Sequence, residues 1–301
     1  RPLRNHAVSA FLVNRLGLFS DTIAPRRPVV VSPIAEEIAM SADIEHAIID
    51  VLGIPTFLAR AGKGRPVVLI HGGSPGACAL VNWKLNIAPL AEAGFAVHAY
   101  DQPGFGRSGV PEDHSMEFRI AHASAFIEAA KLDRPHLIGN SMGAYIAARI
   151  ALENPPVGKL VFISTSTLAP RGSSASQKTA EAHTQVLRRY EPSLENMREL
   201  TKGTLYNQDL VTDELVRERY EMSAGARYEA MLERQKTPPA IPITDELHRL
   251  TSKTMVLWGA NDRGVALERA FLLLDALPDT ELHVFKNCAH WVHWDRAERF
   301  N

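Results

Sequence analysis

The residues best able to do chemistry are a serine between two glycines and an acid and a histidine that follow it. Ser141 lies in the pentapeptide 139–143 (Gly-Asn-Ser-Met-Gly), after the apolar run 136–138 and before a helix-forming segment. A Gly-x-Ser-x-Gly between strand and helix is typical of a nucleophile elbow, a turn so tight that only small neighbours fit. A serine flanked by glycines is also often a helix cap. The order Ser, Asp, His along the chain favours the elbow.

The acid and the base are expected at the ends of two later strands. Asp262 follows the apolar run 254–258 and is our candidate acid, although a loop aspartate commonly caps a helix. His290 and His293 both follow the run 281–285, and we favour His290 because His293 is expected to open the final helix. An imidazole that takes the serine proton, oriented by a carboxylate, makes the hydroxyl a nucleophile. The trio therefore predicts a hydrolase.

A glycine-rich turn, 71–77, follows the first buried strand. Its glycines leave backbone N–H groups free to point at a ligand oxygen, as an oxyanion hole requires. The N–H of Met142, at the start of the helix after Ser141, would be a second donor. A purely structural turn would also explain the glycines, but it would not explain their position directly after a strand.

These residues need a sheet that brings strand ends together. Strands buried on both faces and joined by amphipathic helices indicate a parallel sheet, which binds ligands at its carboxyl edge. The segments 47–51 and 55–60 predict an antiparallel hairpin ahead of that sheet. The fold class is thus α/β, with a mostly parallel, doubly wound sheet. Its expected parallel strands are 66–70, 96–100, 136–138, 159–164, 254–258 and 281–285.

The chain divides into an N-terminal arm and linker (1–43), a core (44–165 and 237–301) and an inserted helical lid (166–236). In the lid the sheet pattern stops, and apolar residues recur at helical spacing between 193 and 231. The arm is rich in arginine and poor in acids, so it could be a targeting or membrane-surface segment. We favour an arm that packs on the body.

Arg219 is the charged residue that helical spacing places on the inward face of the lid. It lies four residues after Leu215 and three before Met222. The alternative is a solvated charge loosely neutralised by Glu214 or Glu218, and spacing alone leaves both open. An inward arginine would suit a substrate carboxylate.

Composition excludes several classes of partner. The 301 residues carry a net charge of −1 with both signs interspersed, so we expect a small-molecule substrate and no nucleic acid. Cys78 and Cys288 are too few for a disulfide framework and fit a reducing, cytoplasmic compartment. No apolar stretch approaches the ~20 residues of a membrane span.

Several motifs together resemble the meta-cleavage product hydrolases. These α/β-hydrolases cut a carbon–carbon bond in the 2-hydroxy-6-oxo-hexa-2,4-dienoates that ring-cleaving dioxygenases make during aromatic degradation. The resemblance runs from about residue 44 to the end, including the lid. The motifs that carry it are 71–77, 81–83 with 86–89, 101–105, 139–143 and 288–291.

The resemblance implies a role for each matching residue. Ser141, Asp262 and His290 would form a catalytic triad, with no cofactor and no metal, and the N–H groups of Gly73 and Met142 would form the oxyanion hole. Other matching positions would bind substrate: Asn82, Asn140 and Arg219 the carboxylate and 2-hydroxyl end, and Trp291 the substrate chain.

Two features depart from the family. Ser74 stands where the family often has glycine and would alter how the polar end of the substrate is held. The N-terminal arm has no counterpart. The family also suggests a homo-oligomer, such as a dimer.

Two other functions stay open. A carboxylesterase would use the same triad without a carboxylate clamp, and a silent ligand receptor could share the fold. Dehalogenase and most epoxide-hydrolase chemistry on this fold needs an aspartate nucleophile, so Ser141 argues against both.

Overall fold

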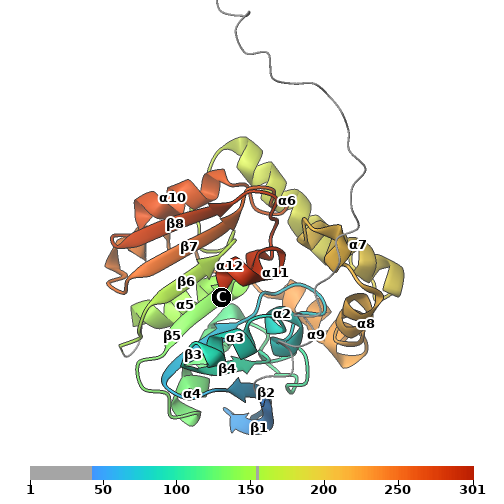
Figure 1. Cartoon of the computed structure of the whole chain (residues 1–301). Coiled ribbons are helices and arrows are strands. Elements are labelled where there is room, and N and C mark those ends of the chain that lie inside the picture. Colours follow the sequence, from blue (N-terminus) through green and yellow to red (C-terminus); the bar gives the residue numbers. More distant parts are fainter. Residues whose placement is uncertain (1–42, 154–155) are drawn as a thin grey trace, which may run out of the picture. The chain divides into compact units, whose positions relative to one another are not determined.

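The computed structural model describes residues 43–153 and 156–301, which form an α/β fold around one eight-stranded sheet (Figure 1). The two strands at one edge run antiparallel to their neighbours, and the other contacts between strands are parallel. In spatial order the strands are β1 (Glu45–Val51), β2 (Ile54–Ala61), β4 (Phe95–Tyr100), β3 (Arg65–Ile70), β5 (His136–Asn140), β6 (Leu160–Ile163), β7 (Thr254–Gly259) and β8 (Thr280–Phe285).

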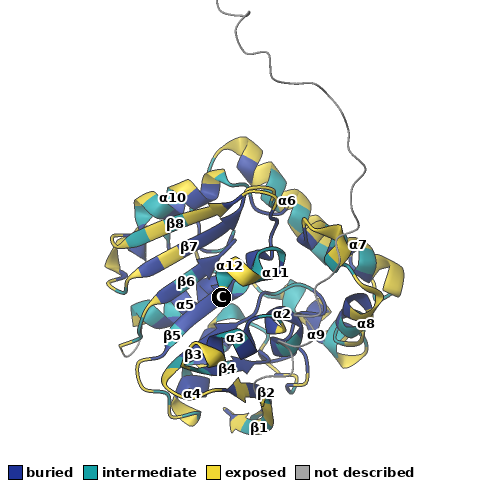
Figure 2. Ribbon diagram, in the orientation of Figure 1, coloured by how far each residue is buried: buried dark blue, intermediate teal, exposed yellow. Residues whose placement is uncertain are grey.

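The predicted fold class is confirmed, and each predicted strand is present with ends shifted by at most two residues. The central strands read as nearly continuous apolar runs because both of their faces are covered. Val68 and Ile70 of β3 pack on one side of the sheet, whereas Val67 and Leu69 pack on the other. This alternation produces two separate hydrophobic clusters. Figure 2 shows the central strands as largely buried.

Helices cover both faces, as a doubly wound sheet requires. Side chains of α4 (Met116–Ala129), α5 (Met142–Glu153) and α10 (Glu268–Ala276) belong to one cluster. Side chains of α2 (Ala79–Trp83), α3 (Ile87–Glu92) and α11 (Val292–Asp295) belong to the other. The last described helix is α12 (Ala297–Phe300).

A group of helices, here called the insertion helices, separates β6 from β7. The helices expected between 193 and 231 are confirmed, but α6, which precedes them, was not predicted from the apolar spacing. The domain boundaries 166 and 236 stay a prediction. The insertion helices are α6 (Ser174–Arg188), α7 (Leu194–Thr204), α8 (Asp213–Glu221) and α9 (Ala226–Lys236), with short 3-10 turns at Gln208–Leu210 and, after α9, Thr244–Arg249.

The predicted N-terminal arm, 1–43, lies outside the described residues except at its last position. Among the helices that the structure describes, none is long and apolar enough to cross a membrane.

Candidate active site

Ser141 occupies a strained turn between β5 and α5. Its φ of 55° lies in the left-handed region, which non-glycine residues rarely adopt. A Cβ atom at Gly139 would collide with the backbone of Gly143, and one at Gly143 would collide with the carbonyl oxygen of Ile70. Both glycines are therefore required sterically, as the elbow motif predicts.

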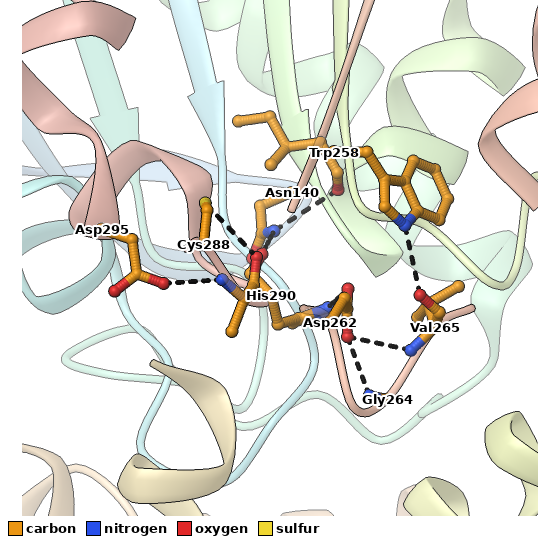
Figure 3. A network of polar contacts seen from close by, with 10 residues as sticks. Asn140, Trp258, Asp262, Gly264, Val265, Cys288, His290 and Asp295 are labelled. Atoms are coloured by element: carbon orange, nitrogen blue, oxygen red, sulfur yellow. Dashed lines mark hydrogen bonds and ion pairs between the residues drawn. The ribbon is translucent and has the colours of Figure 1, made fainter. Parts of the chain in front are cut away.

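Asp262 and His290 meet beyond the ends of the adjacent strands β7 and β8 (Figure 3). Nδ1 of His290 lies 2.8 Å from Oδ2 of Asp262. The other carboxylate oxygen accepts hydrogen bonds from the backbone N–H groups of Gly264 (2.8 Å) and Val265 (2.9 Å). An ionised carboxylate only accepts, so Nδ1 carries the proton and Nε2 is left as a proton acceptor.

The carboxylate of Asp262 is poised to remain ionised. Burial alone would raise its pKa, but the charge and hydrogen bond of His290 and the N–H groups of Val265 and Gly264 hold the pKa below its usual value. Helix α10 begins only at Glu268, and its N-cap residue is Leu267. Asp262 is thus not the cap of that helix, which removes the structural alternative for this residue.

His293 is placed differently from His290. It lies in α11, fully buried, with its ring centroid 4.5 Å from that of Trp83. Neither ring nitrogen has a hydrogen-bond partner among the described residues. Burial lowers the pKa of His293 to about 3. The carboxylate contact therefore selects His290, as predicted from its position in the loop.

Ser141 and His290 both line a cavity of about 800 Å³, within the usual range for a small-molecule site. No hydrogen bond joins the two side chains among the described residues. Such bonds between catalytic groups are often long without substrate and tighten in the complex. The strand ends thus bring the predicted trio to one site, with the carboxylate and imidazole already paired.

Backbone amides border the same cavity. Gly73 lines it together with Met142, and a Cβ at Gly73 would lie 2.9 Å from Sδ of Met142. Met142 is the first residue of α5, so its N–H has no acceptor within the helix. The two residues expected to form an oxyanion hole therefore border the same cavity as Ser141.

Arg219, on α8, is fully buried and has no carboxylate within ion-pair distance among the described residues. Nη1 donates to Oγ1 of Thr201 (3.1 Å), and Nη2 donates to the carbonyl of Pro75 (3.2 Å) and, more weakly, to Oγ of Ser74 (3.4 Å). The guanidinium lies 4.7 Å from the ring centroid of Trp291. Burial lowers its pKa to about 10, so it stays charged at neutral pH.

The glutamates considered as partners of Arg219 are engaged elsewhere. Nζ of Lys84 lies 2.8 Å from Glu214 and 3.2 Å from Glu218. The inward position expected for Arg219 is therefore observed, and the solvated alternative is wrong.

The remaining predicted binding residues fall into two groups. Ser74, Asn140 and Trp291 line the cavity. Asn82 and Arg219 do not line it. Asn82 is buried in α2, where Oδ1 accepts from the N–H of Cys78 (3.3 Å) and Nδ2 has no partner among the described residues. Arg219 lies behind Ser74, with which it shares a hydrogen bond, and against Trp291. The charge of Arg219 is therefore separated from the cavity by the side chains of Ser74 and Trp291.

Comparison with known proteins places this geometry in a family. The family model for the alpha/beta hydrolase fold matches residues 65–297. The 2-hydroxy-6-oxo-6-phenylhexa-2,4-dienoate hydrolase of Burkholderia cepacia is 34% identical over 279 residues, 88% of this chain and 96% of the relative. The 2-hydroxy-6-oxononadienedioate/2-hydroxy-6-oxononatrienedioate hydrolase of Comamonas testosteroni is also 34% identical, over 80% of this chain and 86% of the relative.

A solved structure agrees with the sequence relatives. The meta-cleavage product hydrolase of Pseudomonas fluorescens IP01 aligns with a TM-score of 0.75 at 29% identity, over 85% of this chain and 94% of that one. The chain belongs to the meta-cleavage product hydrolases. The resemblance drawn from the sequence motifs is thereby confirmed.

In this meta-cleavage product hydrolase the cavity also has a wall that sequence reasoning missed. His183 and other residues of α6 line it, as do Arg171 and Arg269. The ring centroid of His183 lies 5.8 Å from that of His290. Ala180, His183 and Leu187 recur at helical spacing, a signal that could have identified α6, but the helix contains too few large apolar residues to stand out.

Proposed function

We propose that the protein hydrolyses the C5–C6 bond of 2-hydroxy-6-oxo-hexa-2,4-dienoates, giving 2-hydroxypenta-2,4-dienoate and a carboxylic acid. Relatives at 34% identity carry names for this activity. The observation that carries the proposal for this chain concerns Arg219. This cation is buried behind the cavity wall, and none of the described carboxylates pairs with it.

A buried charge is costly unless it is paired. Neutral oxygens of Thr201, Ser74 and Pro75 offset part of the cost for Arg219, and the ring of Trp291 offsets another part. Nε of Arg219 still lacks an acceptor among the described residues. A substrate carboxylate at Ser74 would supply the missing negative charge, which an ordinary ester substrate would not.

The first half of the proposed reaction is a tautomerisation. With the carboxylate held at Ser74 and Asn140, and its charge balanced by Arg219 behind Ser74, Nε2 of His290 accepts the proton of the 2-hydroxyl. Protonation at C5 then converts the dienol to its keto form, which provides the electron sink that carbon–carbon cleavage needs. Asp262 stabilises the imidazolium that forms on His290.

The second half is hydrolysis of the ketone. Ser141, or a water that it directs, adds to C6, and the alkoxide that forms is stabilised by the N–H groups of Gly73 and Met142. The C5–C6 bond breaks, its electron pair passes into the dienol product, and the oxygen of water ends in the new carboxylic acid. Neither half calls for a metal or a cofactor.

Replacing Arg219 by methionine tests the proposal, because the volume is nearly kept while the charge is lost. We expect kcat/KM for dienoates to fall about 10- to 100-fold, the value of a hydrogen bond to a charged group. Hydrolysis of p-nitrophenyl esters should remain, since they carry no carboxylate. Steady-state absorbance assays on both substrates measure the ratio of kcat/KM for the dienoate to kcat/KM for the ester.

Arg217→Met is the matched control, because Arg217 is exposed on the same helix. It should leave both activities unchanged. If Arg219→Met lowered both activities equally, or if the wild type cleaved only esters, the carboxylesterase alternative would replace the proposal.

The relatives leave the C6 substituent undecided. One is named for a phenyl group at this position and the other for a second carboxylate, and both are 34% identical to this chain. Which substituent this protein takes depends on the cavity wall beyond Ser141.

A further inference from the structure

The cavity has a second group of cations besides Arg219. Arg171 lies in the loop before α6, and Arg269 lies in α10; both line the cavity. Figure 1 shows α10 and α8, the helix of Arg219, well apart, with α6 extending from near α10 toward α7. Ser141 and His290 line the same cavity as Arg171 and Arg269, whereas Arg219 of α8 does not line it and lies behind Ser74. Arg171 and Arg269 are thus cations of the cavity wall itself, on other elements than Arg219.

Arg269 is held rigidly but is not neutralised. Only 5% of it is exposed. Nε donates to the carbonyl of Pro170 (2.8 Å), and Nη2 donates to the carbonyls of Ser166 and Ala169 (both 2.6 Å). Nη1 makes no hydrogen bond with a described residue, and no carboxylate forms an ion pair with the guanidinium among those residues.

The nearby acids form no ion pair with these cations among the described residues. Glu268 is adjacent to Arg269 in sequence and its charge favours the protonated guanidinium, but its carboxylate oxygens accept from the N–H (2.9 Å) and the hydroxyl (2.7 Å) of Ser173. Glu181 also lines the cavity, but it is exposed on α6, where solvent screens its charge. Burial, followed by the positive charge of Arg171, lowers the pKa of Arg269, and the charge of Glu268 offsets only part of that effect.

The rest of this wall mixes polar and apolar side chains. Gln177, His183 and Thr184 of α6 line the cavity, and so do Ala180 and Leu187 of the same helix. Among the described lining residues, Trp291 is the one Phe, Tyr or Trp. Trp291 belongs to the Arg219 side. Burial lowers the pKa of His183 to about 4, so its ring is neutral at pH 7 and can donate or accept one hydrogen bond.

We infer that the C6 substituent of the substrate ends in a carboxylate, held by Arg269 and Arg171. The substrate would then be a dicarboxylic dienoate with one carboxylate at each group of cations, and hydrolysis would release a dicarboxylic acid. This inference rests on the proposed function and specifies its substrate class. A bare phenyl group would leave Arg269 without a counter-charge.

Two substrates that differ only at the far end test the inference. One is 2-hydroxy-6-oxonona-2,4-diene-1,9-dioate, and the other is 2-hydroxy-6-oxonona-2,4-dienoate, which ends in a methyl group. For the wild type we expect kcat/KM to be about tenfold or more higher for the dioate. The disappearance of the dienolate absorbance measures both.

Variants test whether Arg171 and Arg269 cause the preference for the dioate. Arg171 is exposed, so Arg171→Gln should reduce the ratio of the two kcat/KM values about two- to fivefold. Arg269→Gln should reduce the ratio further, at least tenfold, because Arg269 is buried. Arg188→Gln, at an exposed position of α6 that does not line the cavity, is the charge-matched control and should keep the ratio.

The possible failures are distinct. If the wild type cleaves both substrates equally, or prefers the methyl-ended one or a 6-phenyl dienoate, the inference is overturned and the proposed function stands. An unchanged ratio in Arg171→Gln also overturns it, even if Arg269→Gln fails to fold. If no dienoate is cleaved, the proposed function and the inference fall together.

Discussion

The part of the site built from the core and the part built from the insertion helices are fixed in different ways. Asp262 is held by two backbone N–H groups, and Ser141 by a turn that only its glycine neighbours allow. Arg219 and His183 are instead side chains on α8 and α6. The difference teaches that the core fixes Ser141 and Asp262 through the backbone, whereas the insertion contributes side chains to the cavity wall and to the layer behind it.

The two parts are nevertheless connected. The backbone N–H of His290 donates to the carbonyl of Thr204 in α7 (3.1 Å), and Arg219 bonds to Thr201 of the same helix. Helix α7 thus contacts both His290 and Arg219. Changes at Ser141, Asp262 or His290 should affect every substrate alike, whereas changes in the insertion part, or at a cavity-wall residue such as Arg269, should separate one substrate from another.

The largest effect is expected from Asp262→Asn. An asparagine cannot fix the imidazole tautomer, so kcat should fall about 10³- to 10⁴-fold. Because the change lies in the core part, dienoate and ester hydrolysis should fall by the same factor. Steady-state rates on both substrates test this, with Asp275→Asn, at an exposed position of α10, as the control. A loss of activity confined to dienoates would contradict the distinction between the core part and the insertion part.

Protein stability should depend on pH through buried histidines of the core. Burial lowers the pKa values of His71 and His293 to about 3. The unfolded chain binds protons at these residues below pH ~6.5, whereas the folded chain does not until about pH 3. The free energy of unfolding should therefore fall with decreasing pH, by up to about 1.4 kcal/mol per pH unit for each histidine.

Urea denaturation at pH 7, 6 and 5 measures this dependence. His293→Phe keeps an aromatic ring beside Trp83 and removes one titrating group, so its stability should change less steeply with pH. Equal slopes in the variant and the wild type would show that His293 is not the source.

The smallest effect is expected at Gly264, where the two parts meet. A Cβ there would lie 2.9 Å from the ring of His183, so Gly264→Ala should shift α6 slightly and lower kcat/KM about two- to fivefold. If the contact with His183 is the cause, Gly264→Ala combined with His183→Ala should be no worse than His183→Ala alone. If the two single effects on kcat/KM multiply in the double variant, the contact with His183 is not the cause.

Much of the core part was predictable from sequence for a physical reason. Parallel strands buried on both faces leave apolar runs, and the residues after each run must gather at one edge. This rule located Ser141, Asp262 and His290, and the resemblance then identified the family. For Arg219, spacing left two alternatives open and the resemblance favoured the inward one. The structure confirms it, because Arg219 is buried and Lys84, at the end of α2, engages both candidate glutamates.

The insertion part was less predictable. His183 carries no motif, and its place in the cavity wall depends on helix packing rather than spacing; the same holds for Arg269, which lies on α10 of the core. Asn82 illustrates the opposite case, because its motif is present but its side chain is buried away from the cavity wall. Whether it contacts substrate, and whether the N-terminal arm assists assembly into a homo-oligomer, stay predictions. So does the cytoplasmic location.

The central claim is that Ser141 and its partners cleave a carbon–carbon bond in a substrate held by its carboxylate. Single-turnover stopped-flow absorbance with Ser141→Ala tests it most directly. The account predicts that the variant binds the yellow dienolate with nearly wild-type affinity, while release of the carboxylic acid slows by at least about 10⁴-fold. Cleavage by the variant at the wild-type rate would contradict it.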